Sequence, residues 1–325
     1  MSNIQISENE SEKYSPEWFY SESQTPEWIS FAHKADELRE NFINLFGIER
    51  LKSLFGKDLL TSLFYNDEGT KTNLCYRLEM DKDIREVFGS ISGGAAYKFG
   101  LFYHKKNQSW TCGSPLKPIH LTEDEAIQKA EEMRNDLVEG AEIISSFGPL
   151  DSEEDYEQLY KQLVHIPGIN MVWRMKYYQM LFPSLFAPFY GQDIQLRVLH
   201  FLNQKPSDIP FIRMGQISLY ARKCNVPGVV FAHIYGKNVG YTNETNDSDT
   251  NTLSDKKHKT HYWMYTVFDD KSWNECQQKG IMVLGMDDIG DYSQFASKEA
   301  LRQELIDVYD SSTSRKNQAL MAWNF

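Results

Sequence analysis

Carboxylates are the side chains of this sequence that could most readily do chemistry, and three of them cluster near its C-terminal end. Asp287, Asp288 and Asp291 would suit a divalent metal ion in a nuclease, but no Glu-x-Lys follows them at nuclease-like spacing. Glycines bound the cluster, and Asp–Gly turns account for it. The acidic residues of "SEEDYE" and "TEDEA" lie in predicted helices among polar neighbours, which gives no reason to expect a raised pKa.

The other chemically capable residues show no catalytic spacing. The sequence has no G-x-S-x-G, no H-E-x-x-H and no P-loop motif. Gly93 and Gly94 could cradle a phosphate, but a hairpin turn or bulge is the better interpretation. We predict no active site, metal or cofactor on this chain. The histidines without paired spacing, predicted to be structural, are His165, His200 and His233. The cysteines, which form no C-x-x-C pair and are predicted to be buried, reduced thiols, are Cys75, Cys112, Cys224 and Cys276.

The charge of the chain is unevenly distributed. A net charge of −12 argues, as an average, against nucleic-acid binding. Residues 163–237, however, carry 8 basic and 2 acidic residues, whereas residues 121–162 carry 3 basic and 13 acidic residues. A block of net charge +6 between acidic neighbours is typical of a phosphate-binding surface. The predicted phosphate contacts are Arg197, Arg213, Arg222 and Lys223. The stretch "GQISLYARKCNVP" is similar to the helix of a helix-turn-helix element, with a core helix as the alternative.

Hydrophobic periodicity predicts the elements that would position these residues. Apolar residues three or four apart predict helices from Pro26, over 122–147 and in four segments between 151 and 228, with Thr122 and Glu125 as a capping box. Alternation predicts strands in "NLCYRLEM", "AAYKFGLFYHKK" and "SWTCGSP", which would form an antiparallel meander with Lys98 as a solvated strand residue. The apolar runs are too short to span a membrane and the N-terminus has no signal sequence, so we expect a cytoplasmic protein.

Composition divides the chain into five segments. The start is rich in Ser, Glu and Asn, and a later stretch has almost no apolar residues. The predicted segments are a disordered tail (1–25), an α+β module with acidic helices (26–162), a helical basic module (163–237), a flexible linker (238–260) and a final segment (261–325).

The final segment carries an ordered pattern of aromatic and glycine residues. A first predicted strand holds Tyr262 and Trp263, Trp273 opens a helix, and "GIMVLGM" with "GDYSQF" forms a second strand and its turn. A helix over 298–309 and the ending "KNQALMAWNF" complete the pattern. The segment resembles the opening half of an EVE-type, PUA-like domain, more narrowly the one in McrB-type AAA+ proteins of modification-dependent restriction systems. "FGSISGGAAYKFGLFY", "LTEDEAIQKAEEMRNDLVEGAEII" and "KYYQMLFPSLFAPFY" look like N-terminal regions of the same kind of protein.

The resemblance implies both a fold and a pocket. The expected fold class is α+β, with an antiparallel sheet and helices, a helical basic module and a partial PUA/EVE-like β-barrel. Such barrels hold a flipped-out base, often modified, against aromatic side chains, whose stacking supplies roughly 1–3 kcal/mol per base. Met286 stands where many relatives have a Trp, and it stacks less well. The implied pocket residues, for whose tryptophans a core position is the alternative, are Trp263, Thr266, Val267, Trp273, Met286 and Trp323. The family pattern continues beyond Phe325, so we expect a fragment or a truncated or divergent form.

These expectations lead to three functions. The first is a non-catalytic DNA-recognition module, sensing DNA that is modified or not, at the N-terminus of a restriction or antiphage AAA+ protein with a nuclease partner subunit. The second is a protein-interaction or scaffold module of a bacterial defence complex, in which the basic block pairs with its acidic neighbour. The third is a metal-dependent nuclease.

Overall fold

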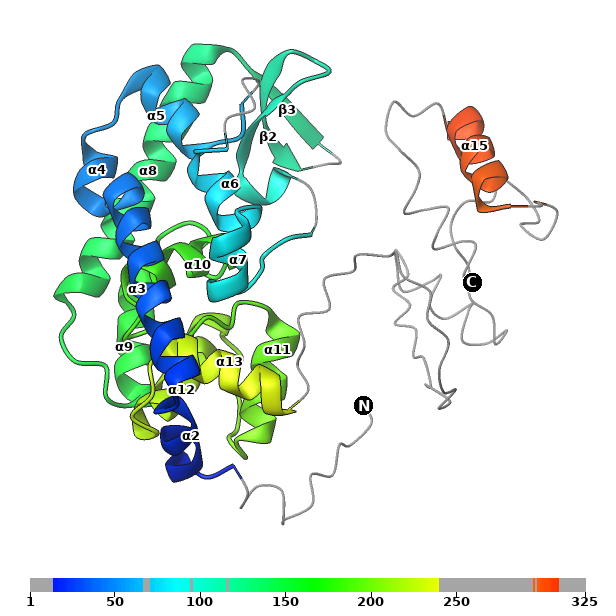
Figure 1. Cartoon of the computed structure of the whole chain (residues 1–325). Helices are drawn as coiled ribbons and strands as arrows, with labels where there is room; N and C mark the ends of the chain where they lie inside the picture. The colour runs from blue at the N-terminus through cyan, green and yellow to red at the C-terminus, as the bar shows by residue number, and fades with distance from the viewer. Residues whose placement is uncertain are drawn as a thin grey trace, which may run out of the picture. The chain divides into compact units, whose positions relative to one another are not determined.

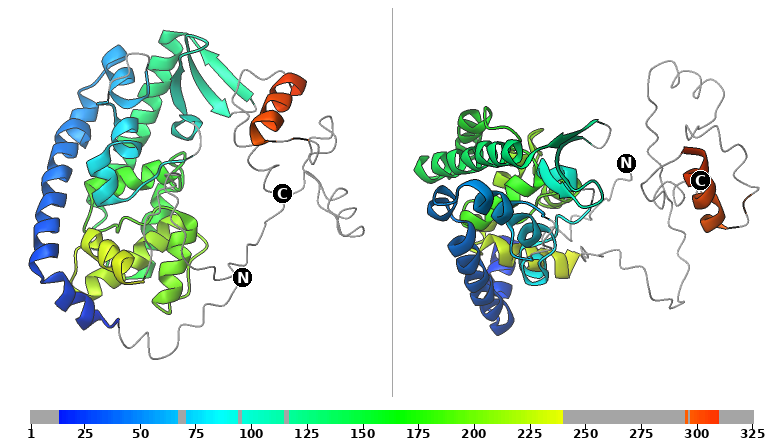
Figure 2. Two further views of the ribbon diagram at one scale, coloured as in Figure 1. Left: turned by 45° about the vertical axis from the view of Figure 1, so that its right-hand side comes forward. Right: turned by 90° about the horizontal axis from the view of Figure 1, so that it is seen from above.

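The protein has an α+β fold that combines many helices with a small three-stranded antiparallel sheet (Figure 1). The computed structural model describes residues 14–66, 71–93, 96–114, 117–239, 295 and 297–309. The chain divides into two compact units, 1–247 and 248–325. In the first unit the sheet and α5 lie at one end, α11, α12 and α13 lie at the other, and α3 runs along one side (Figures 1 and 2).

The first helices begin earlier than the sequence predicts. Helix α2 (Pro16–Ser23) has Ser15 as its N-cap, whose hydroxyl accepts a hydrogen bond from the Trp18 amide at 3.3 Å. The predicted disordered tail therefore does not extend to residue 25, because Ser15 followed by Pro16 is a helix start. The elements that follow are α3 (Pro26–Phe46), α4 (Ile48–Lys52) and α5 (Gly56–Leu63).

The strand predicted in "NLCYRLEM" is wrong, because this segment forms helix α6 (Leu74–Glu79). The Asn73 side chain accepts a hydrogen bond from the Tyr76 amide at 2.8 Å and caps the helix. Leu74 and Leu78 are both buried, and their spacing of four residues suits a helix as well as a strand. Helix α7 (Lys82–Phe88) follows directly, capped by Asp81.

The antiparallel meander is present, but its strands are not all those predicted. The 3₁₀ helix η1 (Ala96–Phe99) replaces the first half of the strand predicted in "AAYKFGLFYHKK". The three strands, in the order β1-β2-β3, are β1 (Leu101–His104), β2 (Ser109–Ser114) and β3 (Lys117–Leu121). Leu101 pairs with Cys112, and Cys112 pairs with Ile119. The third strand was not predicted; its residues are almost all exposed, and only Ile119 and Leu121 alternate with polar neighbours, which is too short a pattern to identify a strand.

The long acidic helix is confirmed. Helix α8 (Glu123–Ser146) begins with the predicted capping box, in which Thr122 and Glu125 bond each other's backbone amides. Its apolar stripe is buried against α4, α5 and the sheet. The buried stripe residues are Ala126, Ala130, Met133, Leu137, Ala141 and Ile144.

The helices predicted beyond residue 150 are also present. Their bounds are α9 (Glu153–Leu163), α10 (Val172–Leu181), α11 (Gln192–Phe201) and α12 (Pro210–Lys223). A fifth helix, α13 (Gly228–Val239), was not predicted. It includes two residues that composition placed in a linker. Helix α12 packs on α9, and α10 packs on α3 and α8, so contacts cross the predicted boundary at residue 162.

In the second unit, the described residues include helix α15 (Lys298–Tyr309), where a helix was expected. Leu301 and Leu305 are buried in it. In the described ranges, no helix has the length and apolar character needed to cross a membrane.

Candidate functional site

Arg213, a predicted phosphate contact, is only 3% exposed. Its Nε donates to Oε1 of Gln195 at 3.0 Å, and its Nη1 donates to the carbonyls of Ser207 at 2.8 Å and Asp208 at 3.1 Å. The guanidinium thus holds the chain before α12 against α11. Its hydrogen bonds are therefore made to groups of the protein and not to solvent.

The other three predicted contacts differ in exposure. Arg222 is half-buried and donates from Nη2 to the carbonyl of Leu150, which joins α12 to the connection between α8 and α9. Arg197 on α11 and Lys223 at the end of α12 are exposed. The structure therefore leaves two of the four predicted cations on the surface, on different helices.

Two further cations of the basic block are buried in α10. Arg174 forms an ion pair with Asp136 of α8, with 3.4 Å between Nη2 and Oδ2. Lys176 has no exposed surface, and its Nζ donates to the carbonyls of Leu78 at 2.9 Å and Gly89 at 2.6 Å. Their position within a helix rich in aromatic residues is the sequence signal for this burial. The net charge of the block does not reveal it, because that sum counts buried and exposed cations alike.

The predicted base-pocket residues cannot be placed. Trp263, Thr266, Val267, Trp273, Met286 and Trp323 all lie outside the described residues. In the part of the chain that is described, no three His, Cys, Asp or Glu side chains come together in a way that could hold a metal ion. Of the cysteines, Cys75 and Cys224 are buried as predicted, and Cys112 is partly exposed.

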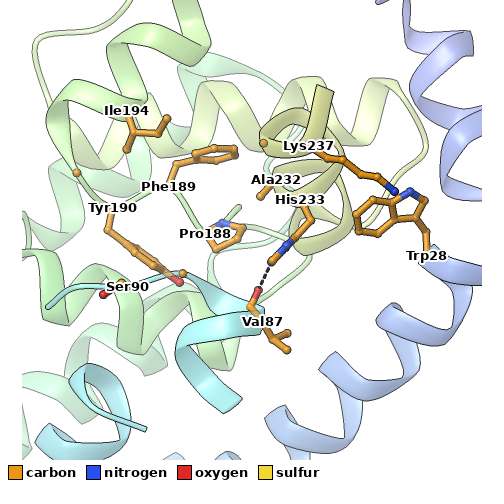
Figure 3. Close-up of a pocket in the computed structure, with 13 residues that line it drawn as sticks. Trp28, Val87, Ser90, Pro188, Phe189, Tyr190, Ile194, Ala232, His233 and Lys237 are labelled. Carbon is orange, nitrogen blue, oxygen red and sulfur yellow. Dashed lines mark hydrogen bonds between the residues drawn. The ribbon is translucent and has the colours of Figure 1, made fainter. Parts of the chain in front are cut away.

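A cavity that the sequence did not predict lies beside α13, and we call it the α13 groove. It has a volume of about 330 Å³. Four segments far apart in sequence line it: Trp28 of α3, the end of α7 with Gly89 and Ser90, residues 188–191 with Ile194 at the start of α11, and one face of α13 (Figure 3). No sequence pattern links these segments, so only the fold brings them together.

Hydrogen bonds fix the walls of the α13 groove. The Tyr190 hydroxyl lies 2.8 Å from the carbonyl oxygen of Phe88 and 3.0 Å from Oε1 of Gln179. Gly89, with a φ of 77°, turns the chain at the end of α7, a conformation that suits glycine. His233 donates from Nε2 to the Val87 carbonyl at 2.8 Å (Figure 3), and its burial lowers its pKa. His233 is thus structural, as predicted.

Lys237 is the charged residue of this groove. Its Nζ lies 2.9 Å from each carboxylate oxygen of Glu27 and 5.3 Å from the ring centroid of Trp28 (Figure 3). Both partners of the ion pair are more than half exposed. The pair is therefore a surface interaction of small net stability.

A second cavity, of about 500 Å³, shares Ser90 and Gly191 with the α13 groove. The loop 90–93 forms one wall, which corrects the hairpin interpretation of the glycines, since a helix and not a strand precedes this loop. Lys98 is not a solvated strand residue: it pairs with Glu79 and donates to the carbonyls of Ile91 at 2.9 Å and Gly93 at 2.8 Å. The lysine holds the loop in place.

The described residues of these two cavities form an arrangement that can bind a ligand. Apolar and aromatic walls with a few polar groups are typical of ligand sites, which commonly measure about 300–1,000 Å³. No protein-family model, no curated protein and no solved structure matches this chain.

Proposed function

We propose that this chain is a non-catalytic, cytoplasmic DNA-recognition module, the N-terminal part of a modification-dependent restriction or antiphage AAA+ protein of McrB type. The observation that carries the proposal is the ordered pattern from Tyr262 to Phe325, in which aromatic and glycine positions resemble those of an EVE-type domain in sequence order. Helix α15, at the position that the pattern requires, supports it. A nuclease partner subunit would supply DNA cleavage.

The exposed cations revise the proposed phosphate contacts. The side chains of Arg197 and Lys223 are exposed and could reach a DNA backbone, although Nε of Arg197 also donates to the carbonyl of Asp193 at 3.4 Å. Arg213 is buried and Arg222 is half-buried, and both donate to carbonyl oxygens. Reversing the charge of Arg213 would test folding rather than DNA binding, because an acidic side chain would face the carbonyls of Ser207 and Asp208.

The first test is a binding titration of the full chain with unmodified, cytosine-modified and adenine-modified duplexes at two salt concentrations. Arg197→Glu with Lys223→Glu should weaken binding to all duplexes alike and lower the slope of log affinity against log salt by about 2, since each phosphate contact contributes about 0.9. Trp263→Ala should instead remove discrimination between the duplexes and leave the salt slope unchanged.

The matched control is Lys82→Glu with Lys129→Glu, which changes the net charge equally at two exposed lysines outside the basic block. This control should bind like the unaltered chain. An absence of affinity for every duplex at low salt would refute the DNA-recognition proposal.

A protein-interaction module is the second candidate, and one observation favours it. Helices α8 and α9 present exposed carboxylates, among them Glu132, Glu139, Glu153 and Glu154, while Arg174 of the basic block pairs with Asp136 of α8. A basic partner would complement this surface. The titration separates the two candidates, because a scaffold module would show no DNA affinity even at low salt.

A further inference from the structure

The α13 groove has rigid aromatic walls. Phe189 and Tyr190 are each 4% exposed and Trp28 is 5% exposed, so their rings are held by the core while they line the cavity. In Figure 3, Phe189 and Tyr190 lie on one side and Trp28 lies on the other, with Pro188 and His233 between them. Flat rings held in this way favour a planar ligand, because stacking costs them little conformational entropy.

The charge that lines the α13 groove is positive. Lys237 is the ionised side chain among the described residues that line it, and none of these residues is Asp or Glu. In a chain of net charge −12, such a wall distinguishes the groove from its surroundings. Ser90 adds a hydroxyl.

The ion pair of Lys237 can be exchanged at small cost. Its carboxylate partner, Glu27, lies outside the lining residues, and an exposed pair of this kind contributes little net stability. An anionic group in the groove would draw the ammonium away from Glu27 and from the face of Trp28, which would free that face for stacking.

We propose that the α13 groove binds a planar aromatic ligand that carries an anionic group, which is the chemistry of a nucleotide. The ring would lie against Tyr190 and Trp28, and the phosphate would pair with Lys237. This site does not depend on the proposed function of residues 261–325.

The ligand could be a free nucleotide or one unit of a single strand. The second cavity begins at Ser90 and Gly191 and continues past Ile91 and Trp173 to Met171, which is 45% exposed. A strand would extend into this cavity, where apolar side chains could meet a second base. A free nucleotide would leave it empty.

The test is a calorimetric titration of the full chain with nucleoside monophosphates and with a single-stranded octathymidine. Lys237→Gln should weaken binding about tenfold or more, because it removes a charge-assisted hydrogen bond. Glu27→Gln should strengthen binding about two- to fivefold, because the competing carboxylate is gone. These opposite effects at two partners of one ion pair would not follow from a merely structural role.

Two further variants complete the experiment. Ala232→Trp should fill the groove and abolish binding, and Lys34→Gln, at an exposed lysine of α3 that does not line it, should change nothing. Tighter binding of the octamer than of any monophosphate would identify a strand as the ligand, and equal binding would identify the free nucleotide. No saturable binding of either probe, or weaker binding by Glu27→Gln, would overturn the inference.

The same variants distinguish this site from DNA recognition elsewhere in the chain. Duplex affinity should be unchanged in Ala232→Trp if the duplex is recognised by residues 261–325. Loss of nucleotide binding with intact duplex binding would support both proposals separately. If nucleotides bind but no duplex does, only the DNA-recognition proposal fails.

Discussion

Lys176 shows why a cation counted in the sequence need not be a cation on the surface. Its ammonium lies at the C-terminal ends of α6 and α7, where it donates to the carbonyls of Leu78 and Gly89, and 5.7 Å from the ring centroid of Tyr190. A positive charge is favourable at a helix C-terminus, but burial opposes it. Burial prevails and lowers the pKa of Lys176 to about 7.

This pKa makes stability depend on pH. An unfolded lysine titrates near 10.4, so between about pH 7 and that value the unfolded chain binds more protons than the folded one. The unfolding free energy should therefore rise with pH over this window, by up to about 1.4 kcal/mol per pH unit. Urea denaturation of the unaltered chain and of Lys176→Met at pH 6, 7, 8 and 9 measures this effect. The unfolding free energy of the unaltered chain should rise with pH relative to that of Lys176→Met.

The comparison with Lys176→Met removes the contributions of other titrating groups to the pH dependence of stability, because both proteins contain those groups. Burial raises the pKa of the Cys75 thiol and of the buried tyrosines, which lowers stability at high pH in both proteins alike. Parallel stability curves for the two proteins would show that Lys176 keeps its charge when folded.

At the scale of elements, α12 packs closely on α9 at a glycine. A Cβ built on Gly215 would lie 2.4 Å from Cδ1 of Tyr156. The tyrosine cannot retreat, because it is fully buried and its hydroxyl donates to the carbonyl of Leu185 at 2.5 Å. Glycine at this position therefore sets the distance between the two helices.

Gly215→Ala is expected to destabilise the protein by about 1–3 kcal/mol or more, since overpacking outweighs the helix propensity that alanine adds. Chemical denaturation measures the loss. Lys129→Ala, on the exposed face of α8, is the control and should change stability by no more than about 0.5 kcal/mol. A neutral Gly215→Ala would mean that α9 and α12 separate easily.

The elements also show how short patterns mislead. "NLCYRLEM" alternates as a strand would, yet Asn73 and Asp81 provide helix caps on either side of α6. Local capping decided the structure of this segment, because six residues are too few for periodicity to distinguish a helix from a strand.

At the scale of the molecule, one hydrophobic core joins the segments that composition separated. Buried residues from Phe19 to Tyr235 belong to a single cluster that includes both sides of residue 162. The cluster joins the predicted α+β module and the predicted basic module through Tyr156, Tyr178 and Phe211, among others.

A shortened chain of residues 1–247 is therefore expected to unfold in one cooperative transition rather than two. Circular dichroism and tryptophan fluorescence should give coincident thermal curves. A chain of residues 26–162 alone should fail to fold, because helix α8 would expose the surface that α10 covers. Two separate transitions would instead support the domain boundary at residue 162 that composition predicts.

The sequence by itself determined the features that depend on local chemistry. The capping box at Thr122, the long periodic helix after it and the helices between residues 151 and 228 were all predictable, because their signals lie within a few residues of one another. The pattern from Tyr262 to Phe325 is likewise a property of the sequence.

Only the tertiary structure decided which charges are exposed and where a ligand could bind. Arg213 and Arg197 look alike in the sequence, but packing buries one among carbonyl oxygens and leaves the other in solvent. The α13 groove is assembled from positions as distant as Trp28 and Lys237. Burial and concavity arise from contacts between remote segments, and a linear pattern of residue types does not contain them.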